Sequence, residues 1–217
     1  MTNRYQAHGI EAEFEPGSRG RVLRNLLGVT SAREMAQVES NALLAAQERL
    51  IEKFSLNHRF TAADIREMHR MWLGKIYPWA GQYRQVNITR DDFMFAAANE
   101  VPRLMGEFER RQLALHTPCR SGDTDEIAAA LAVVHVELVI IHPFREGNGR
   151  CARLLSLLMA FQAGLPPLDF GGLRGKVKQA YIVAIHAAVG SNYEPMKAIF
   201  SRVINRSLRR YGKRGQS

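Results

Sequence analysis

This sequence has only two cysteines, and it has no long apolar run. The two cysteines, Cys119 and Cys151, stand alone, and neither belongs to a Cys-x-x-Cys pair of the kind that a structural zinc site uses. The apolar stretch that ends at Ile141 is interrupted by His135 and Glu137 and is too short to span a bilayer. These absences argue against disulfide-stapled, zinc-stabilised and membrane-spanning proteins.

The sequence also lacks repeats, low-complexity tracts and an export signal. Residues 1–8 have no hydrophobic core of a signal peptide, which together with the unpaired cysteines predicts a cytoplasmic protein. The 217 residues, 46% of them hydrophobic, are enough for one compact domain with a real core.

Acidic residues are missing from the C-terminal end, where none follows Glu194, while the whole chain has a formal charge of +9. The basic residues there are Arg202, Arg206, Arg209, Arg210, Lys213 and Arg214. Their spacing places several on one helix face, which could bind nucleic acid, an anionic membrane or an acidic partner. No aromatic interleaving or recognition motif accompanies them, so we expect a solvated helix end and no specific nucleic-acid binding.

The most informative segment is the run His-Pro-Phe-Arg-Glu-Gly-Asn-Gly-Arg at residues 142–150. An apolar helix is expected over residues 125–141, and Pro143 would end it. A second helix is expected over residues 149–161, closed by Gly164 and the two prolines that follow. The glycine-lined turn at 147–149 is therefore expected where a helix begins.

A helix N-terminus presents unpaired N–H groups and a partial positive charge, which makes it an anion site. Arg150 and Arg153 lie three apart on the second helix, and guanidinium groups grip phosphate oxygens. Glu146 fits this electropositive setting if Mg²⁺ lies between it and the phosphates. His142 is the natural general base for a hydroxyl at neutral pH, since histidine has an ordinary pKa of about 6.5. The implied chemistry is nucleophilic attack on phosphorus.

The run at 142–150, with Arg153 after it, resembles the signature of the Fic (fido) family, His-Pro-Phe-x-Asp/Glu-Gly-Asn-Gly followed by arginines. The resemblance implies an α-helical enzyme that transfers AMP from ATP to a hydroxyl side chain (Ser, Thr or Tyr) of a target protein, releasing pyrophosphate, with Mg²⁺ as cofactor. In family members that transfer other groups the Gly-Asn-Gly sequence tends to be altered, and here it is intact.

The same resemblance assigns a role to each position of the motif. His142 would deprotonate the target hydroxyl, and Phe144 would anchor the loop in the core. Glu146 would hold Mg²⁺. The anion hole would be formed by Gly147, Asn148 and Gly149, while Arg150 would support the phosphates and Arg153 would contact the γ-phosphate. A toxin role, restrained by a small antitoxin protein, is also possible by resemblance.

The segment Ile76-Tyr77-Pro78-Trp79-Ala80-Gly81-Gln82-Tyr83-Arg84 resembles the family's Trp-Ala-Gly segment, and we expect Trp79 to serve packing. Residues 85–95 alternate in character around the polar sequence Arg-Asp-Asp, which predicts a hairpin. In the family this hairpin is a flap that aligns the target by main-chain pairing. The flap residues expected to dock the target are Ile88, Phe93, Met94 and Phe95.

Ser31 and Glu34 have the spacing of a capping box and predict a helix that runs to about Lys53. Some Fic proteins carry on such a helix the motif Ser/Thr-x-x-x-Glu-Gly/Asn, whose glutamate pairs with the second arginine and blocks ATP binding. Glu39 is the matching glutamate here, but Met35 replaces the hydroxyl residue and Ser40 replaces Gly or Asn. The alternative is an ordinary helix-surface glutamate.

The predicted fold is therefore all-α, a compact Fic-type helical bundle with a small β-hairpin flap over the active site. The predicted segments are a lead-in at 1–29, a helix at 30–54 that could be regulatory, a Fic core at 55–201 and a basic tail at 202–217. His135 lies seven residues before His142, so both could share a helix face, but a buried, hydrogen-bonded histidine explains His135 as well. The alternative function is a regulatory module that binds a nucleotide or nucleic acid without transfer.

Overall fold

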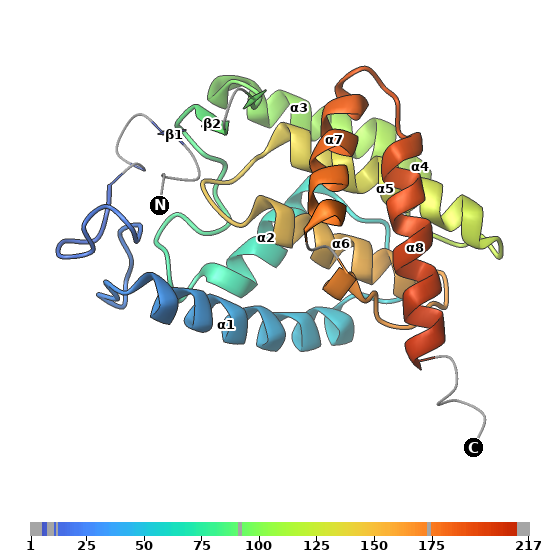
Figure 1. Ribbon diagram of the computed structural model, residues 1–217, viewed down its shortest axis with the longest axis horizontal. Helices are drawn as coiled ribbons and strands as arrows, with labels where there is room; N and C mark the ends of the chain where they lie inside the picture. The colour runs from blue at the N-terminus through green and yellow to red at the C-terminus, as the bar shows by residue number, and fades with distance from the viewer. Residues whose placement is uncertain (1–5, 8–10, 12, 91–92, 173–174, 212–217) are drawn as a thin grey trace. The chain divides into compact units, whose positions relative to one another are not determined.

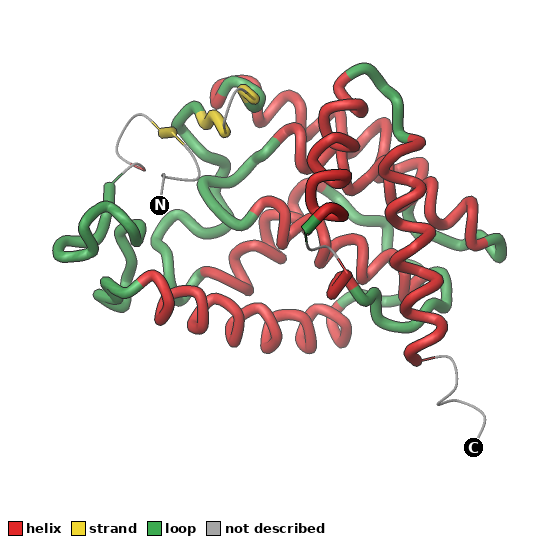
Figure 2. Tube along the Cα trace, viewed as in Figure 1, coloured by secondary structure: helices red, strands yellow, loops and turns green. Residues whose placement is uncertain are grey.

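The computed structural model describes residues 6–7, 11, 13–90, 93–172 and 175–211. Most of these residues are helical, and a small set of strands comes from the N-terminal half of the sequence (Figure 2). The helices are α1 (Ala32–Lys53), α2 (Ala62–Leu73), α3 (Val101–Phe108), α4 (Ala114–His116), α5 (Thr124–Ile141), α6 (Asn148–Gln162), α7 (Lys176–Val189) and α8 (Glu194–Tyr211). Single turns of 3-10 helix lie at Ala98–Glu100 and Phe170–Gly172, and a π-helical turn, Glu109–Leu113, joins α3 to α4. The predicted all-α class with a small hairpin is confirmed.

The chain divides into two compact units, and each is assembled from segments that are far apart in the sequence. The first unit contains Met1–Lys53, Ala62–Gly106 and Ile141–Cys151. The second contains Phe54–Thr61, Glu107–Ile140 and Ala152–Ser217. Segments that are consecutive in the sequence are therefore divided between the two units.

The first unit is built around α1 and α2, which pack side by side (Figure 1). The helix predicted from the capping spacing is confirmed, because α1 begins after Ser31, whose Oγ accepts the N–H of Glu34 at 3.4 Å. Met35 and Leu50 on α1 are buried, and Trp72 on α2 is 2% exposed. The Trp72 ring also lies beside Gly147, in the loop after α5.

The predicted hairpin is present in the first unit as β2 (Ile88–Arg90) and β3 (Phe93–Met94), an antiparallel pair. Its expected Asp91–Asp92 turn lies outside the described residues. An additional strand, β1 (Gln6–Ala7), pairs antiparallel with β2, so the strand order is β1-β2-β3. The sequence predicted only a looped lead-in here, since two residues carry no periodic signal.

The two helices that flank the motif begin and end close to their predicted limits. α5 ends at Ile141, directly before His142 and Pro143, and α6 begins at Asn148. The Gly-Asn-Gly turn therefore lies at a helix start, as predicted. Cys151 is buried in the first unit and Cys119 in the second, and neither forms a disulfide.

The second unit contains α7 and α8, which pack against each other, and the greater part of α5 and α6. His135 on α5 is 1% exposed and its ring contacts the Ser156 hydroxyl at 3.2 Å and the Tyr181 hydroxyl at 2.7 Å. Burial lowers the pKa of His135 to about 3, so the ring is neutral. Of the two explanations for His135, the structure supports the buried, hydrogen-bonded histidine.

The basic residues near the C-terminus extend α8 instead of forming a separate tail. The boundary expected at 201/202 falls inside this helix, and Lys213 and Arg214 lie outside the described residues. Arg206 and Arg210 both donate to Asp169, at 2.8 and 2.9 Å, and these bonds hold the pKa of that carboxyl below its ordinary value. Within the described ranges, no helix is both long and apolar enough for a bilayer crossing.

Candidate nucleotide-transfer site

The loop between α5 and α6 turns sharply at His142, whose φ of +53° lies in the left-handed region that non-glycine residues rarely adopt. The residue is 3% exposed, and its imidazole stacks on Phe95 with ring centres 3.7 Å apart. Because such a backbone geometry is costly, the surrounding contacts must hold it in place. The strain falls on the residue that the sequence assigned as general base.

Phe144 anchors the loop as expected, because its side chain is fully buried and stacks on the His69 ring with centres 3.8 Å apart. The side chain of Asn148 closes the loop: its Oδ1 accepts the Phe144 N–H at 2.8 Å, and its Nδ2 donates to the Phe144 carbonyl at 2.7 Å. The Asn148 side chain therefore shapes the turn, and the donors that remain for an anion are main-chain groups.

Those main-chain donors come from the first turn of α6. The N–H groups of Arg150 and Cys151 both donate to the Gly147 carbonyl, at 3.0 and 2.9 Å. The N–H groups of Asn148 and Gly149 precede this first bonded turn, where a helix has no internal partner for them. Gly147 has a φ of +85°, and a Cβ there would lie 2.7 Å from the Trp72 ring. The turn therefore requires glycine and presents the positive end of the helix dipole.

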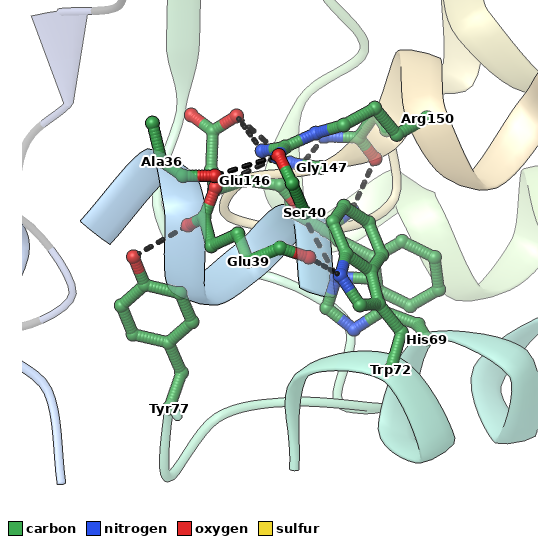
Figure 3. A network of polar contacts seen from close by, with 11 residues as sticks. Ala36, Glu39, Ser40, His69, Trp72, Tyr77, Glu146, Gly147 and Arg150 are labelled. Atoms are coloured by element: carbon green, nitrogen blue, oxygen red, sulfur yellow. Dashed lines mark hydrogen bonds and ion pairs between the residues drawn. The ribbon is translucent and has the colours of Figure 1, made fainter. Parts of the chain in front are cut away.

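The Arg150 guanidinium lies beside this helix start and is held on two sides (Figure 3). It stands 4.6 Å over the Trp72 ring, and its Nη1 donates to Glu39 Oε2 at 2.7 Å. Glu39 is 7% exposed, and its Oε1 accepts the Tyr77 hydroxyl at 2.7 Å. Burial first, and then the Glu39 charge, raise the pKa of Tyr77, which therefore acts as a neutral donor.

The structure pairs Glu39 with a different arginine from the one that the family motif implies. The family motif pairs the glutamate with the second arginine, which would be Arg153, whereas Glu39 contacts the first, Arg150. Glu39 is also not the surface residue of the alternative interpretation, since it is buried and Trp72 Nε1 donates to its carbonyl at 2.9 Å. Arg153 lies one turn after Arg150 on α6, is partly exposed and belongs to the second unit.

Glu146 is partly exposed and lies directly before the candidate anion site. Its Oε1 accepts the Gly147 N–H at 3.0 Å and lies 3.5 Å from Arg150 Nη2. Among the described residues, no cluster of three or more metal-binding side chains exists. A single carboxylate beside a phosphate site fits Mg²⁺, which takes one or two carboxylates and completes its shell with phosphate oxygens and water.

The four flap residues differ in exposure. Ile88 and Phe95 are buried and, with Val86, form a small apolar cluster against which Phe93 packs. Met94 is 75% exposed. Side chains of Ile88 and Phe95 thus hold the flap together, and contact with a target would come through Met94 and the main chain. Among the described residues, the strand order β1-β2-β3 places β3 at one edge of the sheet and β1 at the other.

Two buried residues of this site were missed by sequence reasoning. His69 on α2 accepts the Gly81 N–H at Nδ1 (2.9 Å), and its Nε2 lies 3.0 Å from the Glu146 carbonyl. Burial lowers the pKa of His69 to about 4, so the ring is neutral and its Nε2–H donates to that carbonyl. The other residue is Arg84, which donates to the carbonyl of His142. Arg84 ends the Trp-Ala-Gly segment and His69 lies shortly before it, and only these positions could have suggested the two residues.

Comparison with known proteins agrees with this geometry. Residues 59–160 match the Fic/DOC family. Protein adenylyltransferase VbhT of Bartonella schoenbuchensis is 31% identical over 143 residues, which cover 66% of this chain and 30% of VbhT. Protein adenylyltransferase Fic of Nematostella vectensis is 29% identical over 171 residues, which cover 78% of this chain and 38% of that protein. The chain spans less than half the length of these curated relatives.

A solved structure shares the fold over most of both chains. It is the N-terminal Fic domain of a VirB-translocated Bep effector protein from Bartonella quintana, with bound ADP. Its TM-score is 0.69 at 26% identity, and the alignment covers 88% of this chain and 92% of that chain. The complete motif, the helical fold and these matches agree, and residues 59–160 of this chain therefore belong to the Fic/DOC family.

Proposed function

We propose that this chain transfers AMP from ATP to a hydroxyl side chain of a target protein and releases pyrophosphate. The observation that carries the proposal is the loop at 142–150, which places an imidazole directly before a helix N-terminus with an arginine on its first turn. The names of the relatives, protein adenylyltransferases, support the same reaction. An ADP-bound relative supports an adenine nucleotide as the substrate.

In the proposed reaction, the imidazole of His142 accepts the proton of the target hydroxyl. The hydroxyl oxygen then forms a bond to the α-phosphorus of ATP, and the bond from that phosphorus to the bridging oxygen breaks. Pyrophosphate leaves with the electron pair. The N–H groups of Asn148 and Gly149 would bind the phosphate oxygens on which negative charge increases.

Arg150 would support the β- and γ-phosphates, and Arg153 on the same helix would contact the γ-phosphate. Glu146 would hold Mg²⁺, which neutralises phosphate charge when it is bound. The hydrogen bond from His69 to the Glu146 carbonyl fixes the main chain of Glu146, so the carboxylate side chain extends from a fixed backbone position. β3 would align the target by pairing with an extended segment.

The alternative, a module that binds a nucleotide or nucleic acid without transfer, does not explain the strained backbone of His142. A binding loop has no need of a buried imidazole in the left-handed region beside a phosphate site. The test is incubation of the chain with labelled ATP, Mg²⁺ and cell lysate. Label that reaches protein with wild type, and far more slowly with His142→Ala, supports the enzyme. ATP binding without any transferred label supports the module.

We further propose that Glu39 restrains the site by holding Arg150 away from the phosphates. Support comes from its burial and from the 2.7 Å ion pair, which involves the same guanidinium that the nucleotide would use. Because the restraining carboxylate belongs to the same chain, this contact favours inhibition in cis over a separate antitoxin protein. Transfer that is fast with the purified wild-type chain, and slow only after a second protein is added, would favour the antitoxin.

A further inference from the structure

Arg84, the last residue of the Trp-Ala-Gly segment, is a buried arginine that joins three parts of the first unit. It is 1% exposed. Its Nε donates to the carbonyl of His142 at 2.7 Å, and its Nη2 lies 3.4 Å from the carbonyl of Ile141, the last residue of α5. Its Nη1 donates to the Val86 carbonyl at 2.7 Å, before β2, and its Nη2 donates to the Ala96 carbonyl, after β3.

The residue type suits this position for a physical reason. Arginine presents five N–H donors in a rigid planar fork and has no acceptor, so it can bind several carbonyls in fixed directions. Lysine, with one nitrogen, cannot reach carbonyls on opposite sides at once. Burial lowers the pKa of Arg84 to about 10, which leaves it charged at neutral pH. The cation also lies at the negative end of the α5 dipole.

The contacts fall on both sides of the strained residue. Arg84 Nε holds the carbonyl of His142, and the main-chain N–H of Arg84 donates to the next carbonyl, that of Pro143, at 2.9 Å. The Ile141 and His142 carbonyls, which both contact the Arg84 guanidinium, belong to the peptide groups on the two sides of the His142 Cα, so these contacts hold the φ of +53° at His142. The His142 ring in turn stacks on Phe95, which directly precedes the Ala96 carbonyl that Arg84 also binds.

We infer that Arg84 is a positioning residue that holds the His142 imidazole and both ends of the flap in one fixed relation. A single guanidinium then aligns the base with the strand that would pair with the target segment. This inference rests on the proposed AMP transfer for its kinetic consequence, but not for its structural one. The flap and the loop are coupled through Arg84 whether or not transfer occurs.

The kinetic test compares Arg84→Lys with Arg66→Lys, a matched control whose arginine donates to another main-chain carbonyl, that of Gly81, at 2.9 Å. Misplacement of a reacting group by about 1 Å can cost about 100-fold in rate. We therefore expect Arg84→Lys to lower kcat about 100-fold, with the Kd of ATP changed less than about twofold, because the anion site is separate from these bonds. The control should keep wild-type kcat.

A double variant separates positioning from a general structural role. If Arg84 acts through His142, then Arg84→Lys in the His142→Ala background should remove less than about threefold of the residual activity. A loss that adds in full to that of His142→Ala, or a wild-type kcat for Arg84→Lys, would overturn the inference.

Hydrogen exchange provides a readout that does not depend on transfer. We expect the amides of residues 93–96 to exchange at least about tenfold faster in Arg84→Lys than in wild type, and those of α1 to be unchanged. If the wild type transfers no AMP but this pattern appears, the proposed function fails and the positioning role stands. Unchanged exchange in the flap refutes the positioning role.

Should Arg84→Lys fail to fold, the wild-type protein carries the test. The Arg84 Nε–H proton, observed by NMR, should exchange within about threefold of the rate of the Phe95 amide, which donates to Ile88 at 3.2 Å. If the Arg84 Nε–H exchanges at a rate unrelated to that of the Phe95 amide, then Arg84 and the flap do not open together, and the inference is refuted.

Discussion

The ion pair between Glu39 and Arg150 makes a quantitative prediction about ATP affinity. Glu39→Gln removes the charge while leaving an oxygen that can still accept the Tyr77 hydroxyl, which lies 2.7 Å from the carboxylate. With Arg150 released, the phosphates no longer compete with a carboxylate for the guanidinium. We therefore expect tighter ATP binding and faster transfer in the variant.

The magnitude follows from the environment of the pair. The side chains of Glu39 and Arg150 are 9% and 26% exposed, so solvent screens them less than it screens a surface pair. A hydrogen bond to a charged group contributes about 1.5–3 kcal/mol. If ATP binding requires that this bond be given up, its removal should lower the Kd of ATP about 10- to 150-fold.

The assay is calorimetric titration with Mg²⁺ and ATP in a His142→Ala background, which prevents turnover during the measurement. Glu48→Gln, an exposed change on the same helix α1, is the matched control and should leave the Kd unchanged. A Kd for Glu39→Gln equal to that of the parent, or weaker, would refute the reasoning. Glu39 would then be a packing residue that happens to meet Arg150.

Three further predictions test the loop, the flap and the buried histidines. Gly147→Ala should lower the free energy of unfolding and abolish transfer, because its Cβ would lie 2.7 Å from the buried Trp72 ring. The control is Gly28→Ala, where φ is +66° but the space is open, and the strain there should cost only about 1–3 kcal/mol. Thermal unfolding measures both variants. Met94→Pro should raise the KM for the target protein about tenfold and Met94→Ala by a smaller factor, since both remove the side-chain contact but only proline also removes an edge N–H. Acidification from pH 7 to 5 should lower the free energy of unfolding by about 2 kcal/mol for each of His69 and His135, measured by urea titration. The pKa values of both histidines in the folded chain lie below the ordinary 6.5, so between pH 7 and 5 the unfolded chain binds protons that the folded chain does not. A free energy of unfolding that does not change over this range would contradict the prediction.

Local signals in the sequence predicted the elements that carry the site. Pro143 predicted the end of α5, and the Ser31 and Glu34 spacing predicted the start of α1, because caps and breakers act within one turn. The motif predicted the turn before α6 for the same reason. The pairing of β1 with β2 was not predictable, because it joins Gln6 to Thr89 and depends on where the lead-in folds back.

The partner of Glu39 shows why helix spacing alone could not assign it. Arg150 and Arg153 lie one turn apart on α6, and a sequence motif cannot decide which of them a glutamate 111 or 114 positions earlier will reach. The choice is made by Trp72, whose indole supports the Arg150 guanidinium from one side while its N–H holds the Glu39 main chain. The consequence is chemical, since restraint through Arg150 withdraws the guanidinium in the first turn of the anion site. Release of Glu39 should therefore strengthen binding of ADP as well as of ATP, whereas restraint through a γ-phosphate contact would affect ATP alone.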